Sequence, residues 1–595
     1  MLLRIRIACA FVLVSLGCAP VLATVRYTIT LADPARHLVQ VSMEIPAGRE
    51  THELQLPVWN ALYQIRDFVQ FMNKIVAKDL SGRTLPLQQQ NKSRWLLREA
   101  GDGARVEYQM FSDEPDPFGA QLNSHHAFFN LAQILMYADD SRGEAAEVEF
   151  RNVPAGWKIA TSLAQHGATF AAGNYDELVD SPVEIGTLAE RDFDGRCGKY
   201  RVVADATGAD AIFPKILPPI EHVVEAATAW MNDCPFQTYT FIYHFSDSAN
   251  SGGMEHAYST AITEPLGSVQ NDLERFTAVT AHEFFHLWDV KRIRPQSLEP
   301  VDYTKEDYTT ALWFSEGVDT AAADKIRLRA GLLDEQRYLD RLSQAITELE
   351  NQPAHLTQSA EQSSLDAWLE KYPHYGLPER SISYYNKGEL LGVLLDLKMR
   401  QATHGRESLQ TLFRWMNEHF AKQGKFFDDS DSVRAGAEKM TGADFGEFFA
   451  DYISGVQEIP WNSFFESVGL KVGTVEATLT HRGFDAVQKF DQSPGVVRVA
   501  PGSAAEQAGL KSGDTLLSIN GTAAGRTFEQ QIEALGPGAA LRLRVRRDGV
   551  PYDLHWKLEA QKMKIYHVED LPSISLAQRA ERKAWLFGDA STPPQ

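Results

Sequence analysis

Residues 24 to about 185 show the alternation of apolar and polar side chains that is typical of half-buried β-strands. In one run the apolar side chains occupy every second position: Val39, Val41, Met43 and Ile45. This spacing places one face of a strand in a core and the other in water. The same period returns near residues 106–110 and 148–150, and clusters of Gly, Pro and Asp separate the runs. The pattern predicts a β-sandwich-like domain over residues 24–185.

The middle of the chain changes from this period of two to helical spacing. Residues 186–250 mix strand-like runs with one helical run, and helical patterns dominate residues 271–457. From about residue 470 short strands return, separated by glycines. A length of 595 residues suits three or four domains. We therefore predict a multidomain α+β protein with domains at 24–185, 186–465 and 470–560 and a C-terminal tail at 561–595.

The first 23 residues are typical of a signal peptide rather than of the fold. Arg4 and Arg6 precede an apolar run over residues 7–16, and Val21-Leu22-Ala23 supplies a cleavage site. The run is too short to span a bilayer, and no later stretch reaches the ~20 apolar residues that a span needs. We predict an exported, periplasmic protein that begins at Thr24. Gly17-Cys18 leaves a lipoprotein anchor open as the less favoured alternative.

Export changes the interpretation of cysteine and charge. Cys197 and Cys234 are the pair that remains after cleavage, and an oxidising compartment favours a disulfide between them. Two arginines leave with the signal peptide, so the formal net charge changes from −21 to −23. Such a surface repels nucleic acid and anionic membranes. We expect no nucleic-acid partner, no transmembrane span, and a charge that serves solubility.

His282-Glu283-Phe284-Phe285-His286 is an HExxH motif within a helical pattern. Residues four apart share one face of a helix, so both imidazoles can reach one ion while Glu283 lies beside them. Zinc suits two neutral imidazoles and a carboxylate, with a fourth position left to water. The apolar residues that flank the motif argue against two solvated surface histidines. The motif predicts a zinc site with Glu283 as the general base.

Glu316 is the candidate for the third zinc ligand. It lies in a second apolar helical run, Leu312 to Gly317, 30 residues after His286. This separation allows the chain to leave the first helix, turn, and bring a second helix alongside. Taken alone, a buried Glu is as often part of a salt bridge as a ligand.

The residues His282 to Pro295, together with Trp313 to Gly317, resemble the glycyl aminopeptidase family of gluzincin zinc metallopeptidases. The catalytic domain of that family is similar to that of the aminopeptidase N group. The resemblance covers nearly all of the mature chain. It implies a β-rich N-terminal domain, a thermolysin-like catalytic domain that is first mixed and then α-helical, and a C-terminal PDZ domain.

The resemblance also assigns roles to two further motifs. Gly252-Gly253-Met254-Glu255 is similar to the substrate-binding segment whose Glu binds the free α-amine of a peptide. Glycines at a strand edge also let a substrate backbone approach closely. Tyr385 is similar in placement to the tyrosine that donates a hydrogen bond to the oxyanion of the tetrahedral intermediate. Its neighbour Tyr384 stays open as the alternative donor.

The sequence departs from the family in places that put substrate preference in doubt. Relatives tend to carry Thr and then aromatic residues after the Glu-Gly pair, whereas this chain continues Val318-Asp319-Thr320-Ala321. Asp289 stands where Asn is expected. Asp289 or Asp319 could orient a ligating histidine, but an exposed helix carboxylate is the preferred interpretation of each.

A basic cluster follows the HExxH motif in this otherwise acidic chain. It consists of Lys291, Arg292 and Arg294. Contact with a substrate carboxylate is one interpretation. Solvation, or pairing with nearby acids, is the preferred one.

Residues 497–521 strongly resemble a PDZ domain, with Phe528 to Leu535 as the helix of the peptide groove. Such domains take an extended peptide as an added strand and bind its C-terminal carboxylate. Gly483-Phe484 is the candidate carboxylate-binding loop, although the usual Gly-Leu-Gly-Phe form is missing. A packing domain without a ligand stays open.

Together these features predict a zinc-dependent aminopeptidase that hydrolyses peptides. A preference for small N-terminal residues such as Gly or Ala is implied by the resemblance alone. Two alternatives remain: a zinc endopeptidase with the same metal site, and a non-catalytic PDZ protein of peptide quality control. A structural zinc site needs no general base and is closed to water, so Glu283 argues against the last.

Overall fold

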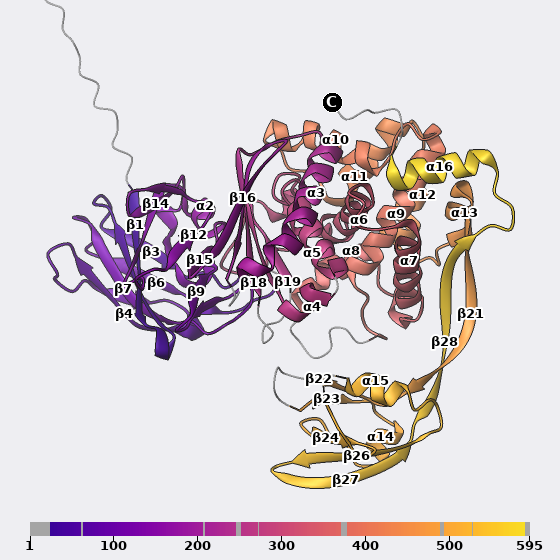
Figure 1. The fold of residues 1–595 in the computed structure, drawn as a ribbon. Coiled ribbons are helices and arrows are strands. Elements are labelled where there is room, and N and C mark those ends of the chain that lie inside the picture. The colour runs from indigo at the N-terminus through magenta and orange to yellow at the C-terminus, as the bar shows by residue number, and fades with distance from the viewer. Residues whose placement is uncertain are drawn as a thin grey trace, which may run out of the picture.

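The computed structural model describes residues 24–60, 63–205, 209–245, 252–271, 273–369, 378–487, 493–525 and 527–588. The described chain forms a β-rich N-terminal part, a largely helical middle and a small C-terminal domain that hangs away from both (Figure 1). This is the multidomain α+β architecture that the sequence predicts. Among the described helices, none combines the length and apolar character that a bilayer crossing requires.

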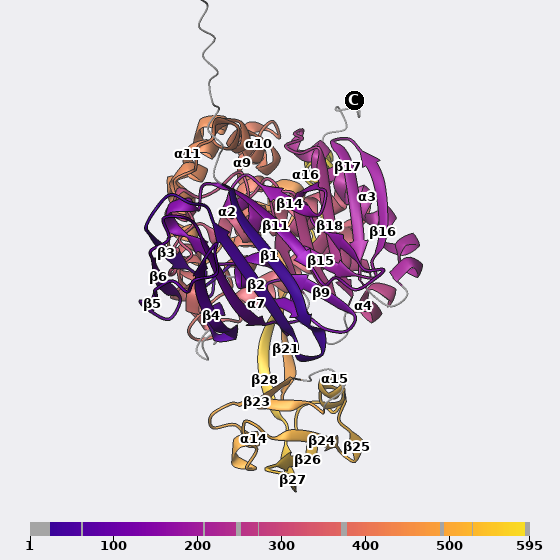
Figure 2. The same cartoon turned by 90° about the vertical axis from the view of Figure 1, so that its left-hand side faces the viewer.

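The N-terminal domain is built from three sheets. Its largest sheet has seven strands in the order β13 (Ala164–His166), β14 (Thr169–Ala172), β11 (Ala145–Arg151), β1 (Thr24–Asp33), β2 (Leu38–Ile45), β7 (Ala104–Phe111) and β4 (Met72–Asp79). A second sheet comprises β10 (Tyr137–Ala138), β3 (Thr51–Gln55), β6 (Arg94–Arg98) and β5 (Leu87–Gln89). Alternate residues of β2 are buried, as their period of two predicts. Figure 2 views the seven-stranded sheet from its outer side.

The third sheet of this domain lies toward the middle of the molecule. Its order is β12 (Lys158–Ala160), β15 (Val183–Gly186), β9 (His126–Phe129) and β8 (Ala120–Leu122). Two short helices accompany the domain, α1 (Leu131–Ile134) and α2 (Tyr175–Val179). The third sheet therefore carries side chains that can meet the next domain.

The middle of the chain, where the resemblance predicts a catalytic domain, begins with a five-stranded sheet. Its order is β16 (Ala189–Gly195), β17 (Gly198–Ala204), β18 (Thr238–Phe245), β20 (Ser259–Glu264) and β19 (Gly252–Glu255). The central strands β17, β18 and β20 are parallel, and β19 is an antiparallel edge strand. Helices α3 (Phe213–Met231) and α5 (Leu273–Phe285) pack on one face. The Cys197–Cys234 disulfide joins the β16–β17 turn to the segment after α3, which confirms the predicted pairing.

The remaining helices of this part enclose one large apolar core. They are α4 (Leu266–Asn271), α6 (Asp319–Arg329), α7 (Glu335–Glu350), α8 (Ala360–Leu365), α9 (Tyr384–Thr403), α10 (Leu409–His419), α11 (Asp429–Thr441), α12 (Gly446–Phe448) and α13 (Trp461–Phe465). A π-helical turn, Trp313–Val318, leads into α6 and lies against α9. At that contact a Cβ on Gly317 would lie 2.5 Å from the Cα of Gly388. Two glycines therefore let the backbones that carry Glu316 and Tyr385 touch directly.

The small C-terminal domain is attached by a ribbon of two long antiparallel strands, β21 (Leu470–His481) and β28 (Glu559–Asp570) (Figure 1). Its sheet contains β22 (Phe484–Val487), β23 (Gly495–Val499), β24 (Thr515–Ile519), β26 (Ala540–Arg547) and β27 (Val550–Lys557), with β25 (Thr522–Ala523) paired to β24. Helices α14 (Ala504–Gln507) and α15 (Phe528–Glu533) complete a separate apolar core.

The described part of residues 561–595 is not the tail that the sequence predicts. Strand β28 returns to the catalytic part, and helix α16 (Leu576–Phe587) then packs there. Trp585 and Leu586 are fully buried in the large core, and the Trp585 ring lies 3.7 Å from Lys325 Nζ. The sequence gives little sign of these anchors, because only two residues of α16, Trp585 and Leu586, are buried.

Candidate active site

Helix α5 and the π-helical turn bring the three predicted zinc ligands together. The Nε2 atoms of His282 and His286 lie 3.1 Å apart. The Oε2 atom of Glu316 lies 3.4 Å from the first and 3.3 Å from the second. His286 and Glu316 are 1% and 5% exposed, so the donors meet inside the protein.

These three donors fit a zinc ion in both geometry and chemistry. A tetrahedral ion with bonds of about 2.0–2.1 Å separates its ligand atoms by about 3.3 Å. The observed separations, 3.1 to 3.4 Å, cluster around that value. Two imidazoles and one carboxylate are also the donor set of zinc sites that keep a position open for catalysis.

The Nδ1 atoms of the two histidines contact Asp319 and the backbone of Asp289. From the sequence, both aspartates are expected at the surface. Asp319 is fully buried, with its Oδ2 atom 2.8 Å from His282 Nδ1. His286 Nδ1 donates to the backbone carbonyl of Asp289, which is also fully buried. The preferred interpretation of both aspartates as exposed helix carboxylates is wrong. Asp319 follows Glu316 by three residues, so one helical turn places both on the face that meets the histidines.

The bonds at Nδ1 determine which ring nitrogen can bind a metal. A proton on Nδ1 leaves the Nε2 lone pair free for a ligand bond. The carboxylate beside His282 and the carbonyl beside His286 therefore orient both rings toward the point where the three donors converge.

Glu283 lies beside the donors on the same helix. Its side chain is 6% exposed, and its Oε2 atom has no hydrogen-bond partner among the described residues. Burial raises the pKa of Glu283 to about 8, although His282 and His286 oppose the shift. A Cβ on Gly253 would lie 2.4 Å from the Glu283 carboxyl carbon. Gly253 is thus the residue that allows strand β19 to pass over this carboxylate.

Strand β19 contains the predicted substrate-binding residues Gly252, Gly253, Met254 and Glu255. It pairs only with β20 among the described strands, so its other edge is available to an extended peptide. Glu255 offers a carboxylate oxygen within 4.8 Å of donor atoms of Glu283 and His286. The structure therefore brings Glu255 to the metal donors.

The two tyrosines at the start of α9 have different surroundings. Tyr385 lines the cavity, and its ring centre lies 6.1 Å from that of His282. Burial raises the pKa of Tyr385 well above its ordinary value, and Glu316 adds to the shift. Tyr384 is 2% exposed and packs in a cluster with Trp59 and Trp368. Of these two tyrosines, Tyr385 is the one that lines the cavity, where its hydroxyl can donate a hydrogen bond.

The cavity over these groups has a volume of about 120 Å³ and is shared by two domains. The N-terminal domain supplies a wall that sequence analysis missed: Trp59, Asn60, Tyr63, Phe118, Asn130 and Asp180. Tyr63 has a φ of 49°, a left-handed conformation that side chains of this size seldom adopt. No motif marks these residues, because their role depends on how one domain docks on another.

Two residues of the basic cluster after the HExxH motif pair with acids, as the preferred interpretation predicts. Lys291 Nζ lies 2.6 Å from Asp180, and Arg294 Nε donates to Glu299 at 2.9 Å. Arg292 donates to the backbone carbonyl of Leu287 at 2.6 Å. Lys291 and Arg294 also line the cavity.

In the C-terminal domain, the predicted loop and helix lie next to each other. The carbonyl of Gly483 accepts hydrogen bonds from the Ala500 amide and the Ser503 hydroxyl. Arg482 pairs with Glu529 on α15 at 2.7 Å, which places a cation at the loop. Helix α15 begins at Phe528, where the sequence places the groove helix, and ends at Glu533, before the predicted Leu535.

Three family models match the chain, each over one part. Residues 26–187 match the Peptidase M61 N-terminal domain, residues 275–391 match M61 glycyl aminopeptidase, and residues 495–547 match a PDZ domain. No curated protein matches the chain.

Among solved structures, the chain is similar to an aminopeptidase N family protein from Idiomarina loihiensis. The two are 25% identical, the match covers 94% of this chain and 100% of that one, and the TM-score is 0.80. The M1 zinc metallopeptidase from Deinococcus radiodurans matches at 14% identity over 74% of this chain and 95% of its own, with a TM-score of 0.45. Yeast LTA4 hydrolase matches at 12% identity over 75% and 70%, with a TM-score of 0.47.

Proposed function

We propose that this chain, a peptidase of the M61 glycyl aminopeptidase family, is a zinc-dependent aminopeptidase that removes small N-terminal residues from peptides. The observation that carries the proposal is the placement of Glu255. This carboxylate lies on an open strand edge, within 4.8 Å of Glu283 and the metal donor His286. A carboxylate at this point can bind the α-ammonium group of a peptide and set the distance to the scissile bond.

His282, His286 and Glu316 would hold the zinc ion. A zinc ion bound there supplies a Lewis acid that polarises the scissile carbonyl and acidifies a water molecule. The remaining chemistry belongs to side chains of this chain.

Glu283 handles the proton. As a base it takes a proton from the attacking water, and as an acid it then delivers that proton to the departing amine. A raised pKa suits both roles, because a catalytic group works best when its pKa is near the working pH. Burial, which raises the pKa of Glu283, acts in this direction.

Tyr385 acts on the carbonyl oxygen of the scissile bond. Its raised pKa keeps the phenol protonated. It can therefore donate a hydrogen bond to the negative charge that develops on this oxygen in the transition state. A donor that is already in place needs no reorganisation during the reaction.

The N-terminal domain limits what can enter. Trp59, Asn60 and Tyr63 contribute to the wall of a cavity of about 120 Å³. A preference for short side chains such as those of Gly and Ala is proposed from the match to the glycyl aminopeptidase family.

We also propose that the mature protein works outside the cytoplasm and that the PDZ domain binds peptide C-termini. The Cys197–Cys234 disulfide supports export, because disulfides persist in oxidising compartments. Arg482, which lies beside the Gly483 loop and pairs with Glu529, supports recognition of a carboxylate.

A comparison of free and N-acetylated peptides tests the aminopeptidase assignment. Acetylation removes the charge and the donors that Glu255 would bind. For the wild type, kcat/KM should fall by a factor of about 100 or more on acetylation, since the half-buried carboxylate of Glu255 is left without its partner. Glu255→Ala should be slow on free Ala-Ala peptides and should discriminate much less between the two substrates.

The control is Glu299→Gln, which changes a carboxylate that pairs with Arg294 at the side of the cavity. This variant should discriminate as the wild type does. Equal discrimination by the wild type and Glu255→Ala would remove Glu255 from amine binding. Rapid internal cleavage of acetylated peptides would instead identify an endopeptidase.

A further inference from the structure

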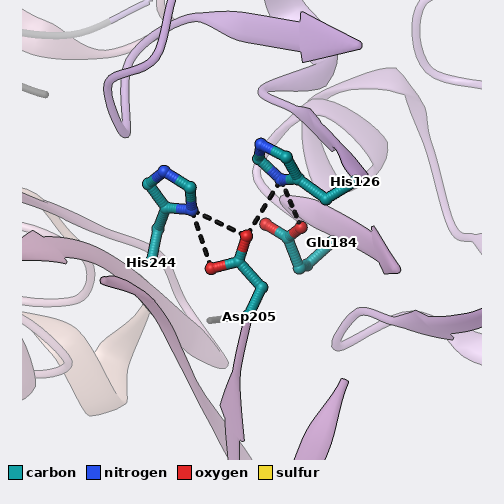
Figure 3. A group of neighbouring side chains, drawn as sticks. All are labelled: His126, Glu184, Asp205 and His244. Carbon is teal, nitrogen blue, oxygen red and sulfur yellow. Dashed lines mark hydrogen bonds and ion pairs between the residues drawn. The ribbon is translucent and has the colours of Figure 1, made fainter. Parts of the chain in front are cut away.

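A second cluster of histidines and carboxylates lies where the N-terminal domain meets the catalytic sheet (Figure 3). His126 is on β9 and Glu184 is on β15, both in the third sheet of the N-terminal domain. His244 is on β18 of the five-stranded sheet, and Asp205 directly follows β17. Three strand residues and one residue that directly follows a strand, from two domains, thus converge on one point.

Strand periodicity explains why His244 faces this point. Tyr243 and Phe245 of β18 are buried in the core under α3 and α5, so His244 points to the opposite face. There its ring stacks on that of His126, with ring centres 4.8 Å apart and planes inclined by 14°.

Both imidazoles direct Nδ1 at the carboxylates between them (Figure 3). His126 Nδ1 lies 2.9 Å from Glu184 Oε1 and 3.0 Å from Asp205 Oδ2. His244 Nδ1 lies 2.7 Å from each carboxylate oxygen of Asp205. One donor atom from each of the four residues can be chosen so that all lie within 4.8 Å of one another.

One acceptor in this cluster is left over. Glu184 is fully buried, and its Oε2 atom has no hydrogen-bond partner among the described residues. A buried carboxylate oxygen without a partner is costly, because it has lost the water that solvated it. A cation at the centre of the cluster would supply that partner.

The contact that His126 makes through its other ring nitrogen, Nε2, is also typical of metal sites. His126 Nε2 lies 2.9 Å from the side-chain oxygen of Gln121, which can only accept a hydrogen bond. A proton held on Nε2 leaves the Nδ1 lone pair free to bind a metal. Orienting contacts of this kind, from the far side of the ring, are typical of metal-ligating histidines.

We propose that His126, Glu184, Asp205 and His244 bind a second divalent metal ion of the zinc type. Two imidazoles and two carboxylates suit zinc, and a full set of four protein ligands is typical of a structural site rather than a catalytic one. The charge of one divalent cation balances the two carboxylates. Tetrahedral zinc separates its ligands by about 3.3 Å. The histidine nitrogens and carboxylate oxygens that now lie 2.7 to 3.0 Å apart would therefore move apart by about 0.3 to 0.6 Å. Donor pairs that are farther apart, up to 4.8 Å, would approach one another.

Such an ion would join two domains at a place that affects the active site. Strand β18 is two positions from β19 in the five-stranded sheet, and β19 carries Glu255. Phe118 and Asn130, which line the catalytic cavity, lie in the chain on either side of β8 and β9. The second metal would therefore hold the cavity wall of the N-terminal domain in register with the catalytic sheet.

Metal counting on the untagged full-length chain tests this proposal. After saturation with zinc and removal of the excess by gel filtration, mass spectrometry should find two zinc ions per wild-type chain. The double variant His282→Ala/His286→Ala removes the catalytic donors and should retain one. Adding Glu184→Gln to that background should reduce the count to zero. Adding Glu114→Gln instead, a matched change in the pocket beside the cluster, should leave it at one.

Two further readouts cover the case of a variant that fails to fold, which circular dichroism would reveal. Zinc should raise the Tm of the His282→Ala/His286→Ala chain, and cobalt in that chain should give the intense visible absorption of a four-coordinate site. A folded wild type that binds one zinc, or a count unchanged by Glu184→Gln, would overturn the second site. Neither result would affect the proposed peptidase activity, which the substrate comparison tests separately.

Discussion

The cluster at His282 and the cluster at His126 use the same side chains in different ways. The first takes three donors from two helical segments of one domain, and its fourth side opens into a cavity that holds Glu283 and Tyr385. The second takes four donors from strands of two domains, and stacked rings and carboxylates fill it. An open set of three suits chemistry, whereas a closed set of four suits the joining of domains. The difference shows that donor identity alone does not define the role of such a cluster.

The cluster at His282 has a neighbouring base, Glu283, and we expect the largest effect on the rate from changing it. Glu283→Gln keeps the size of the side chain but removes the proton acceptor. We expect kcat to fall by about 10³-fold or more while the zinc content is unchanged. Peptide hydrolysis combined with metal analysis measures both. Glu114→Gln, a carboxylate change beside the closed cluster, is the control and should keep the wild-type rate. Wild-type turnover by zinc-loaded Glu283→Gln would show that a different group is the base.

The tyrosine pair provides the next test of the open cluster. Tyr385→Phe removes the phenol that faces the cavity, and kcat should fall by about 10²–10³-fold with little change in KM. Tyr384→Phe is the matched control, because Tyr384 packs beside Trp59 and Trp368 away from the metal donors. Steady-state kinetics of both variants decide the assignment. A larger loss in Tyr384→Phe would reverse it.

A smaller effect is expected from the groups behind the zinc ligands. Asp319→Asn weakens the contact that orients His282, and zinc affinity should fall by about 10–100-fold. Competition with a chelator measures the affinity. Asp340→Asn on the exposed face of α7 is the control and should bind zinc as the wild type does. An unchanged affinity in Asp319→Asn would mean that the ring of His282 is oriented without this carboxylate.

The smallest effect concerns the domain contact beside the cavity. Asp180, at the end of α2, contacts Lys291, His256 and the backbone amide of Ala257. Burial opposes ionisation, but Lys291 and His256 hold the pKa of Asp180 well below its ordinary value. The stabilisation from this carboxylate is therefore complete above about pH 4 and is lost as the pH falls through the lower, folded-state pKa.

Asp180→Asn should accordingly lower the free energy of unfolding by about 1–3 kcal/mol at neutral pH, and by progressively less below pH 4. Denaturant titration at several pH values measures this difference. Asp176→Asn breaks an ion pair with Arg142 that lies within the N-terminal part of the chain, and it should cost at most about 1 kcal/mol. A pH-independent loss in Asp180→Asn would show that the carboxylate contributes packing rather than charge.

The sequence alone was sufficient for the features that are encoded locally. The period of two in residues 24–185 and the helical spacing after residue 271 predict the two kinds of architecture, because side-chain direction follows backbone periodicity. His282 and His286 share a helix face through their spacing of four, and Glu283 lies beside them. Glu316 lies in the next apolar helical run, so the whole donor set is contained in about 35 residues.

Only the tertiary structure decided the features that depend on contacts between distant segments. Asp289 and Asp319 look like exposed carboxylates in sequence but are buried behind the metal donors. Residue 184 is 58 positions from His126, so no local pattern could connect them. The segment of helix α16 looks like a tail in the sequence, because the burial of Trp585 in the core is seen only in the structure. In each case the surroundings of the side chain are supplied by segments that are remote in sequence, and periodicity carries no information about such pairs.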